Sequence, residues 1–308
     1  MILTVTLNPM LDKTVLLDRL RPGTIHRASA MGAVVGGKGV NVSRQLLFLG
    51  SRSLATGFAG GETGRALRRM LSEEGIPERF VTIGGQTREG VTYREANGRV
   101  SAVFEPPHQV RSSEARELRD RCRSLLTRAS WVVCSGSSPC RQTDTLFRLI
   151  LRDARERGVR TALDSYGPAL AQAVASRPTL LKANREEYES TFDTRLRSTR
   201  EIKSLLGGRI RYGSEICIIT DGARAVHASG EGRFYRILPP ATRSVNPTGS
   251  GDSMLAGILL GLERGWDLAR SLVFGVAAGV ANASVWAVAA GRPATIAHIA
   301  RAVHIEEV

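Results

Sequence analysis

Two patterns of apolar residues alternate along the chain. Short runs of consecutive apolar residues, typical of buried strands, are followed by stretches in which apolar residues recur at helical spacing. This alternation predicts an α/β fold in which helices cover both faces of a mostly parallel sheet. The predicted strands span residues 2–7, 53–57, 131–135, 160–164, 180–182 and 215–220. The predicted helices span residues 39–49, 63–74, 144–157, 251–264, 267–286 and 295–302, so the C-terminal part is expected to be largely helical.

Two segments do not follow this alternation. Residues 14–35 hold short strand-like pieces around Arg21-Pro22-Gly23, and residues 89–104 are typical of a hairpin that turns at Asn97-Gly98. Neither segment has a helix to cover it, so we expect the two to form a small β-sheet that acts as a lid. The predicted lid comprises residues 11–35 and 88–106, and the predicted main domain comprises residues 1–10, 36–87 and 107–308.

The composition is that of a globular protein with a core of useful size. Of the 308 residues, 42 % are hydrophobic and 23 % are charged, which excludes a disordered chain and a disulfide-stapled miniprotein. The net charge of +14 first suggests nucleic-acid binding, but the many arginines are dispersed among acidic residues, as between Arg116 and Arg128. We therefore expect no nucleic-acid partner, and we expect the excess charge to attract anionic substrates.

The sequence favours a cytoplasmic location. The four cysteines have neither C-x-x-C nor zinc-site spacing, and Met1 leads directly into an apolar run without a charged leader. The longest apolar stretch, residues 268–291, contains Arg270 and Asn282. A helix buried in a large core explains this stretch better than a membrane span does, so no membrane partner is expected.

The clearest candidate for a catalytic motif is Gly249-Ser250-Gly251-Asp252 at the start of a predicted helix. Glycines allow backbone N–H groups to turn toward an anion, and the helix N-terminus adds a positive dipole. An aspartate here has the chemistry of a general base for a hydroxyl nucleophile. The structural alternative is that Asp252 only caps the helix.

A second glycine-rich turn, residues 32–39, also precedes a predicted helix. It nearly matches the P-loop pattern G-x-x-x-x-G-K-[ST], but Gly39 stands where the Mg²⁺-binding hydroxyl belongs, which disfavours a P-loop NTPase. The Gly37-Lys38 turn still suits close backbone approach to a polar ligand, and Asn41 adds an amide. The alternative is an ordinary strand-to-helix turn.

Polar residues also follow two of the predicted strands. Asp12 comes just past the first strand, at the edge where α/β proteins place ligands, although it also suits a turn. Lys182 ends another strand, and Asn184 and Glu187 follow it on one side of a helical first turn. The structural alternative for this last pair is a capping box.

These motifs, in this order, resemble the ribokinase-like (pfkB) family of carbohydrate kinases. The likeness is strongest to the sugar-phosphate branch that contains 1-phosphofructokinase and tagatose-6-phosphate kinase, and it covers essentially the whole chain. The resemblance implies a ribokinase-like three-layer domain with a β-sheet lid. The segments that carry it are residues 7–12, 36–42, 135–139, 182–187 and 247–253.

The resemblance implies a role for each candidate residue in phosphoryl transfer from ATP to a ketohexose phosphate. Asp252 would be the base on the acceptor hydroxyl, and the backbone amides of Gly249, Ser250 and Gly251 would bind the transferring phosphoryl group. Arg88 would bind the phosphate that the sugar already carries. The residues expected to hold the sugar itself are Asp12, Gly37, Lys38, Asn41 and Ser137.

The resemblance also implies a nucleotide site, a metal ion and an oligomer. Asn184 and Glu187 would position Mg²⁺ through water, Lys182 would reach the nucleotide phosphates, and Thr220 and Gly222 would lie along the nucleotide. Lids of this kind pair in the family, so a homodimer through the lid is expected. The chain departs from the family pattern at Ala183, at Ser138 and in the shortened segment 220–225, which borders the nucleotide.

Two rival interpretations remain at this point. The first is a kinase for an unphosphorylated sugar or a nucleoside, which Arg88 and the opening segment 8–12 disfavour. The second is a non-catalytic or nucleic-acid-binding protein of kinase fold, which only the net charge favours. The choice among fructose 1-phosphate, fructose 6-phosphate and tagatose 6-phosphate stays open.

Overall fold

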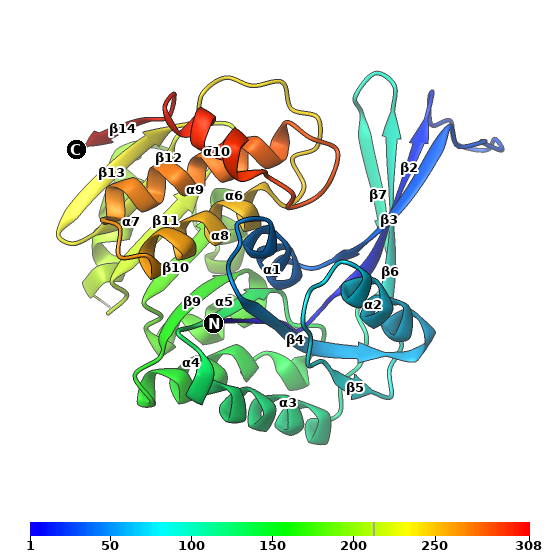
Figure 1. The fold of residues 1–308 in the computed structure, drawn as a ribbon, viewed down its shortest axis with the longest axis horizontal. Helices are drawn as coiled ribbons and strands as arrows, with labels where there is room; N and C mark the ends of the chain where they lie inside the picture. The colour runs from blue at the N-terminus through cyan, green and yellow to red at the C-terminus, as the bar shows by residue number, and fades with distance from the viewer. Residues whose placement is uncertain (212) are drawn as a thin grey trace.

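A large twisted sheet forms the centre of the molecule (Figure 1). In residues 1–211 and 213–308, which the computed structural model describes, ten strands pair in the order β14-β13-β12-β11-β10-β9-β8-β1-β4-β5. The strands from β11 to β5 in this order are parallel, and β11 to β14 pair in antiparallel fashion. The strands are β1 (Ile2–Thr6), β4 (Ser53–Gly60), β5 (Val81–Ile83), β8 (Trp131–Gly136), β9 (Arg160–Ser165), β10 (Leu180–Asn184), β11 (Ile216–Thr220), β12 (Val226–Gly230), β13 (Arg233–Leu238) and β14 (His304–Glu307).

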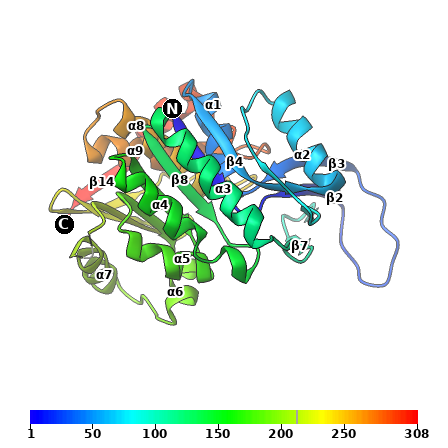
Figure 2. The same ribbon diagram turned by 90° about the horizontal axis from the view of Figure 1, so that it is seen from below.

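Helices cover both faces of this sheet, as Figures 1 and 2 show. One face packs against α3, α4, α5 and α7, and the other packs against α1, α8 and α9. The predicted α/β fold class is therefore confirmed. The helices are α1 (Lys38–Phe48), α2 (Gly61–Glu73), α3 (Ser112–Leu125), α4 (Leu146–Glu156), α5 (Gly167–Ala173), α6 (Arg185–Phe192), α7 (Thr199–Arg211), α8 (Ser250–Glu263), α9 (Leu268–Ala283) and α10 (Pro293–Ala300).

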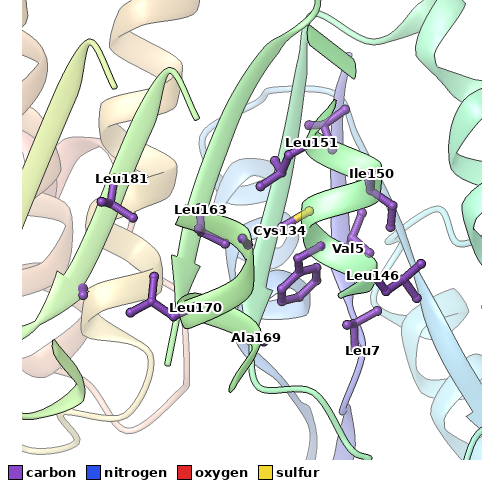
Figure 3. Packing of buried hydrophobic residues seen from close by; sticks show 14 of the residues in the cluster. Val5, Leu7, Cys134, Leu146, Ile150, Leu151, Leu163, Ala169, Leu170 and Leu181 are labelled. Carbon is purple, nitrogen blue, oxygen red and sulfur yellow. The ribbon is translucent and has the colours of Figure 1, made fainter. Parts of the chain in front are cut away.

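The apolar runs form strands because both of their faces are removed from water. Every residue of β1 and of β8 is buried, and alternate side chains join different clusters on the two faces. In Figure 3, Val5, Cys134 and Leu163 of three neighbouring strands point toward Ile150 and Leu151 of α4. Burial of such side chains contributes about 1.5–3 kcal/mol each, relative to leaving them exposed.

The described residues also form a second, four-stranded sheet in the order β3-β2-β6-β7. It projects from the main body at the right of Figure 1 and follows directly from the carboxyl ends of β1 and β5. Its residues are largely those of the two segments expected to form the lid. The strands are β2 (Met10–Leu17), β3 (Ala30–Gly36), β6 (Arg88–Glu95) and β7 (Val100–Phe104).

Several elements differ from the sequence-based expectation. Three strands that were not predicted, β12, β13 and β14, extend the sheet by antiparallel pairing, and β14 lies in the C-terminal part that was expected to be largely helical. The helix expected over residues 267–286 ends at Ala283, because the chain then turns back through a loop that hydrogen-bonds Asn282. The expectation that no helix covers the lid is wrong at its base, where α2 contacts β2 and β3. Within the described residues, the helices are too short or too polar to cross a membrane.

Candidate active site

The candidate residues gather along the edge where the parallel strands end. The carboxyl ends of β10 and β11 border a cavity of about 780 Å³, which the N-terminus of α8 also lines. All of the predicted catalytic and nucleotide-side residues line this cavity together, and Lys38, which was predicted to hold the sugar, lines it with them. They are Lys38, Lys182, Asn184, Glu187, Thr220, Gly222, Gly249, Ser250, Gly251 and Asp252.

Gly249 enters the first turn of α8 in the left-handed conformation, with a φ of 79°. A Cβ at this position would meet Val288 Cγ1 at 2.7 Å, so both the conformation and the space require glycine. Ser250 N–H donates to the Pro247 carbonyl at 3.1 Å, which closes the turn. This turn forms the wall of the cavity next to Lys182, whose Nζ lies 3.1 Å from the position of a Gly251 Cβ.

Asp252 lies in the first turn of α8 and is only 6 % exposed. Its Oδ2 accepts a hydrogen bond of 2.8 Å from Asn41 Nδ2. The interpretation of Asp252 as the helix cap is wrong, because the N-cap residue is Gly249. Burial raises the pKa of the Asp252 carboxyl to about 6, although the charge of Lys38 and the hydrogen bond from Asn41 act in the opposite direction. This carboxyl can therefore accept a proton at neutral pH, as a general base must.

Two lysines share a buried carboxylate beside the cavity. Asp164, at the end of β9, accepts from Lys182 Nζ at 2.7 Å and from Lys38 Nζ at 3.1 Å, and it is fully buried. Burial alone would raise the pKa of Asp164, but the ammonium groups of Lys182 and Lys38 outweigh it and lower this pKa. Lys38 Nζ also lies 2.6 Å from Glu187 Oε1, and these carboxylates keep the lysine charged despite its burial. The two ammonium groups are therefore held in fixed positions, and Asp164 and Glu187 balance their charges.

Asn184 and Glu187 form a capping box at the start of α6, as the structural alternative predicted. Asn184 Oδ1 accepts from the Glu187 N–H at 2.7 Å, and Glu187 Oε2 accepts from the Asn184 N–H at 3.1 Å. Both residues nevertheless line the cavity. Within the described part of the chain, no group of three or more His, Cys, Asp or Glu side chains could hold a metal ion. This pair fits an Mg²⁺ ion held mainly by nucleotide phosphates and water, not one caged by protein.

The remaining candidates lie on and beside the four-stranded sheet. Asp12 of β2 is buried and accepts from Thr92 Oγ1 at 3.2 Å; burial raises the pKa of its carboxyl, while Thr92 and the charge of Arg88 lower it. Among the described residues, the buried Nε of Arg88 has no hydrogen-bond partner. Asn8 Nδ2 donates to Ser137 Oγ at 3.2 Å, and Gly37 takes a φ of 132°.

Sequence reasoning missed three polar residues that organise this site. Asp164 ends a buried strand, so the rule that selected Asp12 could have found it. Asn282 is fully buried in α9; its Nδ2 donates to the Thr248 carbonyl at 2.8 Å and its Oδ1 accepts from Ala289 N–H at 2.6 Å. In the sequence, the signal that could have identified Asn282 is a single amide side chain within an otherwise apolar helix. The third residue, Arg44, gave no signal in the sequence.

Comparisons with known proteins found relatives that match nearly the whole chain. The profile of the family described as "pfkB family carbohydrate kinase" matches residues 5–294. The chain is 32 % identical over 265 residues to tagatose-6-phosphate kinase of Staphylococcus epidermidis, covering 85 % of each protein. It is 31 % identical over 284 residues to 1-phosphofructokinase of Borreliella burgdorferi, covering 92 % of each. Its fold matches the tetrameric inhibited form of phosphofructokinase-2 from Escherichia coli with a TM-score of 0.90, at 26 % identity and 98 % coverage of each chain.

Proposed function

Because the chain belongs to the pfkB family of carbohydrate kinases, we propose that it transfers the γ-phosphoryl group of ATP to a hydroxyl of a ketohexose phosphate. The products are ADP and a sugar bisphosphate. The observation that carries the proposal is the buried carboxyl of Asp252, which lies directly behind the Gly249–Gly251 turn in a cavity with two lysines. The relatives named as sugar-phosphate kinases give the substrate class.

In this reaction Asp252 accepts the proton of the attacking hydroxyl. Asn41 already donates a hydrogen bond to Oδ2 of Asp252, so Oδ1 of Asp252 is the oxygen that receives the proton. The backbone N–H groups of Gly249 and Gly251 are proposed to bind the charge that develops on the transferring phosphoryl group, assisted by the dipole of α8. The Ser250 N–H, which was expected to join them, already donates to the Pro247 carbonyl. Lys182 adds a positive charge beside the same turn. The chain therefore contributes positioning and charge neutralisation, which dominate phosphoryl transfer.

The nucleotide occupies the cavity that borders Thr220 and Gly222. We propose that ATP enters with Mg²⁺, which neutralises phosphate charge, and that Asn184 and Glu187 hold water molecules of the ion. The aliphatic lining of the same cavity, including Val226, Pro239 and Val280, suits the flat face of an adenine ring. A cytoplasmic location follows from this assignment, because ATP and sugar phosphates are intracellular reactants.

The sugar phosphate is proposed to lie between the four-stranded sheet and Asp252. We propose that Asp12, Gly37, Asn41 and Ser137 contact its hydroxyls and that Arg88 binds its phosphate. Two observations support Arg88 in this role: its buried Nε lacks a partner among the described residues, and burial lowers its pKa in spite of the charge of Asp12. An anion would restore both the hydrogen bond and the counter-charge.

The four-stranded sheet is also proposed to mediate a homodimer. Its strands β3 and β7 expose the large apolar side chains Met31, Val100, Val103 and Phe104, each at least half exposed. Exposed apolar patches of this kind mark protein interfaces. Val103→Lys is expected to leave a monomer by sedimentation analysis, whereas a wild-type protein that already sediments as a monomer would contradict the proposal.

A coupled assay of ADP release tests the activity. Tagatose 6-phosphate, fructose 1-phosphate and fructose 6-phosphate are compared with fructose and ribose, at fixed MgATP. At least one sugar phosphate is expected to exceed both free sugars in kcat/KM. Better turnover of a free sugar would reject the proposed substrate class, and tight, sequence-selective DNA binding at physiological salt would support the nucleic-acid alternative.

The substitution Arg88→Ala tests whether Arg88 binds the phosphate that the sugar carries. Loss of a charge-assisted contact is expected to raise KM for the sugar phosphate about tenfold or more, with KM for ATP unchanged. The control is Arg99→Ala, which removes an exposed arginine from the turn between β6 and β7. Equal changes in the two KM values for Arg88→Ala would place Arg88 outside the sugar site.

A further inference from the structure

Arg44 is a buried arginine on α1 that the proposed reaction does not use. It is 5 % exposed, although arginine is rarely buried without a specific partner. Its Nε donates to Glu74 Oε2 at 2.5 Å and its Nη2 donates to the Val35 carbonyl at 2.9 Å. The remaining nitrogen, Nη1, donates to Asn41 Oδ1 at 2.9 Å. Arg44 is therefore held on three sides and touches the residue that binds Asp252.

This contact fixes the orientation of the Asn41 amide. A guanidinium has only donors, so the amide atom that faces Arg44 must be the acceptor Oδ1. The opposite atom, Nδ2, must then face Asp252, to which it donates at 2.8 Å. An ionised carboxylate only accepts, so this orientation matches the ionised form of Asp252. Rotation of the amide by a half-turn would present an oxygen to Asp252 and would favour the protonated form.

We propose that Arg44 is a positioning residue for the catalytic base: together with Glu74, it locks the Asn41 amide so that Asp252 stays ready to accept a proton. The inference rests on the proposed function, because it takes Asp252 to be the base. Glu74 anchors the guanidinium, so that Arg44 cannot swing away from Asn41 when the site is empty. The chain of contacts runs from the end of α2, through α1, to the start of α8.

The other charged groups around Asp252 come from different elements and are unchanged in the variants below. They are Lys38 of α1, Asp164 of β9 and Lys182 of β10. If replacement of Arg44 moves the low-pH side of the kcat profile, its acid limb, the shift therefore reports two things. These are the loss of the contact with Asn41 and the loss of the arginine charge. A double-mutant cycle with Asn41 separates these two contributions.

The experiment measures kcat against pH at saturating substrates for wild type and Arg44→Gln. The acid limb is expected to move up by about one pH unit, the size that loss of one hydrogen bond to a charged group supports. For a base that titrates near pH 6, kcat then falls about fivefold at pH 6 and hardly changes at pH 8. Both proteins meet the same substrates, so titration of the substrate phosphates cancels in the comparison.

Asn41→Ala and the double variant complete the cycle. If Arg44 acts through Asn41, Arg44→Gln adds no further shift in the Asn41→Ala background. Additive shifts would overturn the inference, as would an Arg44→Gln protein with the wild-type acid limb. Arg44→Lys keeps a donor-only cation and is expected to restore most of the profile, whereas a profile like that of Arg44→Gln would also contradict the proposal.

The matched control is Arg68→Gln. Arg68 makes the same kind of contacts, to Glu78 at 2.8 Å and to the Phe80 carbonyl at 2.8 Å, but it touches no residue of the site. It is expected to lower the melting temperature without moving the pH profile. If Arg44→Gln fails to fold with Glu74 left unpaired, the double variant Arg44→Gln/Glu74→Gln replaces it.

The proposed function and the proposed role of Arg44 can be rejected independently of each other. A wild-type protein that phosphorylates no sugar phosphate, or a fully active Asp252→Asn, rejects the proposed function and with it the role of Arg44. An active wild type, an inactive Asp252→Asn and an unshifted Arg44→Gln reject the role of Arg44 alone.

Discussion

Asp252→Asn is expected to change activity and stability in opposite directions. Asparagine keeps the size of the side chain and can still accept the hydrogen bond from Asn41, but it cannot accept the proton of the sugar hydroxyl. Loss of a general base typically costs about 10²–10⁴-fold. We therefore expect kcat to fall at least about 100-fold, with little change in KM for ATP.

The stability change follows from the pKa of the buried carboxyl. The folded protein raises the pKa of Asp252 from 3.8 to about 6, so the folded state binds this proton more tightly than the unfolded state does. Keeping the group ionised above pH 6 then costs about 3 kcal/mol of folding free energy. The cost is present above the folded pKa and disappears as the pH falls through 6 toward 3.8. At pH 4 most of this cost is gone.

The substitution Asp252→Asn removes this cost, although it also removes a negative charge from the N-terminus of α8, which is worth about 0.3–1 kcal/mol. The variant is therefore expected to be about 2 kcal/mol more stable than wild type at pH 8 and nearly equal to it at pH 4. Urea unfolding at the two pH values measures the difference, and the ADP-release assay measures kcat. Near-normal kcat would refute the role as base, and lower stability at pH 8 would refute the electrostatic reasoning.

Two further changes test the residues that hold the site together. Asp164→Asn leaves Lys38 and the buried Lys182 without their shared carboxylate, so we expect unfolding free energy to fall by about 3–5 kcal/mol in urea titration; a loss below about 1 kcal/mol would contradict this. Asn282→Ala removes the hydrogen bond that holds the Thr248 carbonyl. Because the peptide group is planar, the direction of this carbonyl also fixes the direction of the Gly249 N–H. We expect a fall in kcat of about tenfold or more at nearly constant sugar KM, and an unchanged kcat would show that the turn holds itself.

The periodicity of the sequence was sufficient for the elements that are buried on both faces. β1 and β8 are continuous apolar runs, and α4 is strongly amphipathic, so each was predicted within two residues of its observed bounds. β12 was not predicted, because Val226–Gly230 contains His227 and Ser229 and looks polar. It becomes a buried strand only because β11 and β13 pair with it on either side.

The residues of the site fall into the same two classes: those that a local sequence pattern predicts and those that only the tertiary fold brings together. Asp252 and the glycine turn were visible because local backbone chemistry demands those residue types in sequence. The ion pair between Lys38 and Asp164 joins residues 126 positions apart, and it depends on how α1 sits over the end of β9. No local pattern encodes that distance, so Lys38 was assigned to the sugar without its partners. Arg44 was missed for the same reason, because Glu74 reaches it from the far end of α2.

The position of β1 between β4 and β8, inside the sheet, has a consequence for the order in which the chain can fold during synthesis. β1 emerges from the ribosome first, yet its neighbours are β4 and β8, and the Asn41–Asp252 contact spans 211 positions. Until α8 and α9 are made, α1 covers only part of the face of the sheet that carries Ile2, Trp131 and Val133. A nascent chain that ends at β11 therefore exposes a broad apolar surface, which makes it a ready substrate for chaperones and prone to aggregation. Contacts of such long sequence separation also slow folding, so the catalytic centre forms only when the last quarter of the chain docks onto the first.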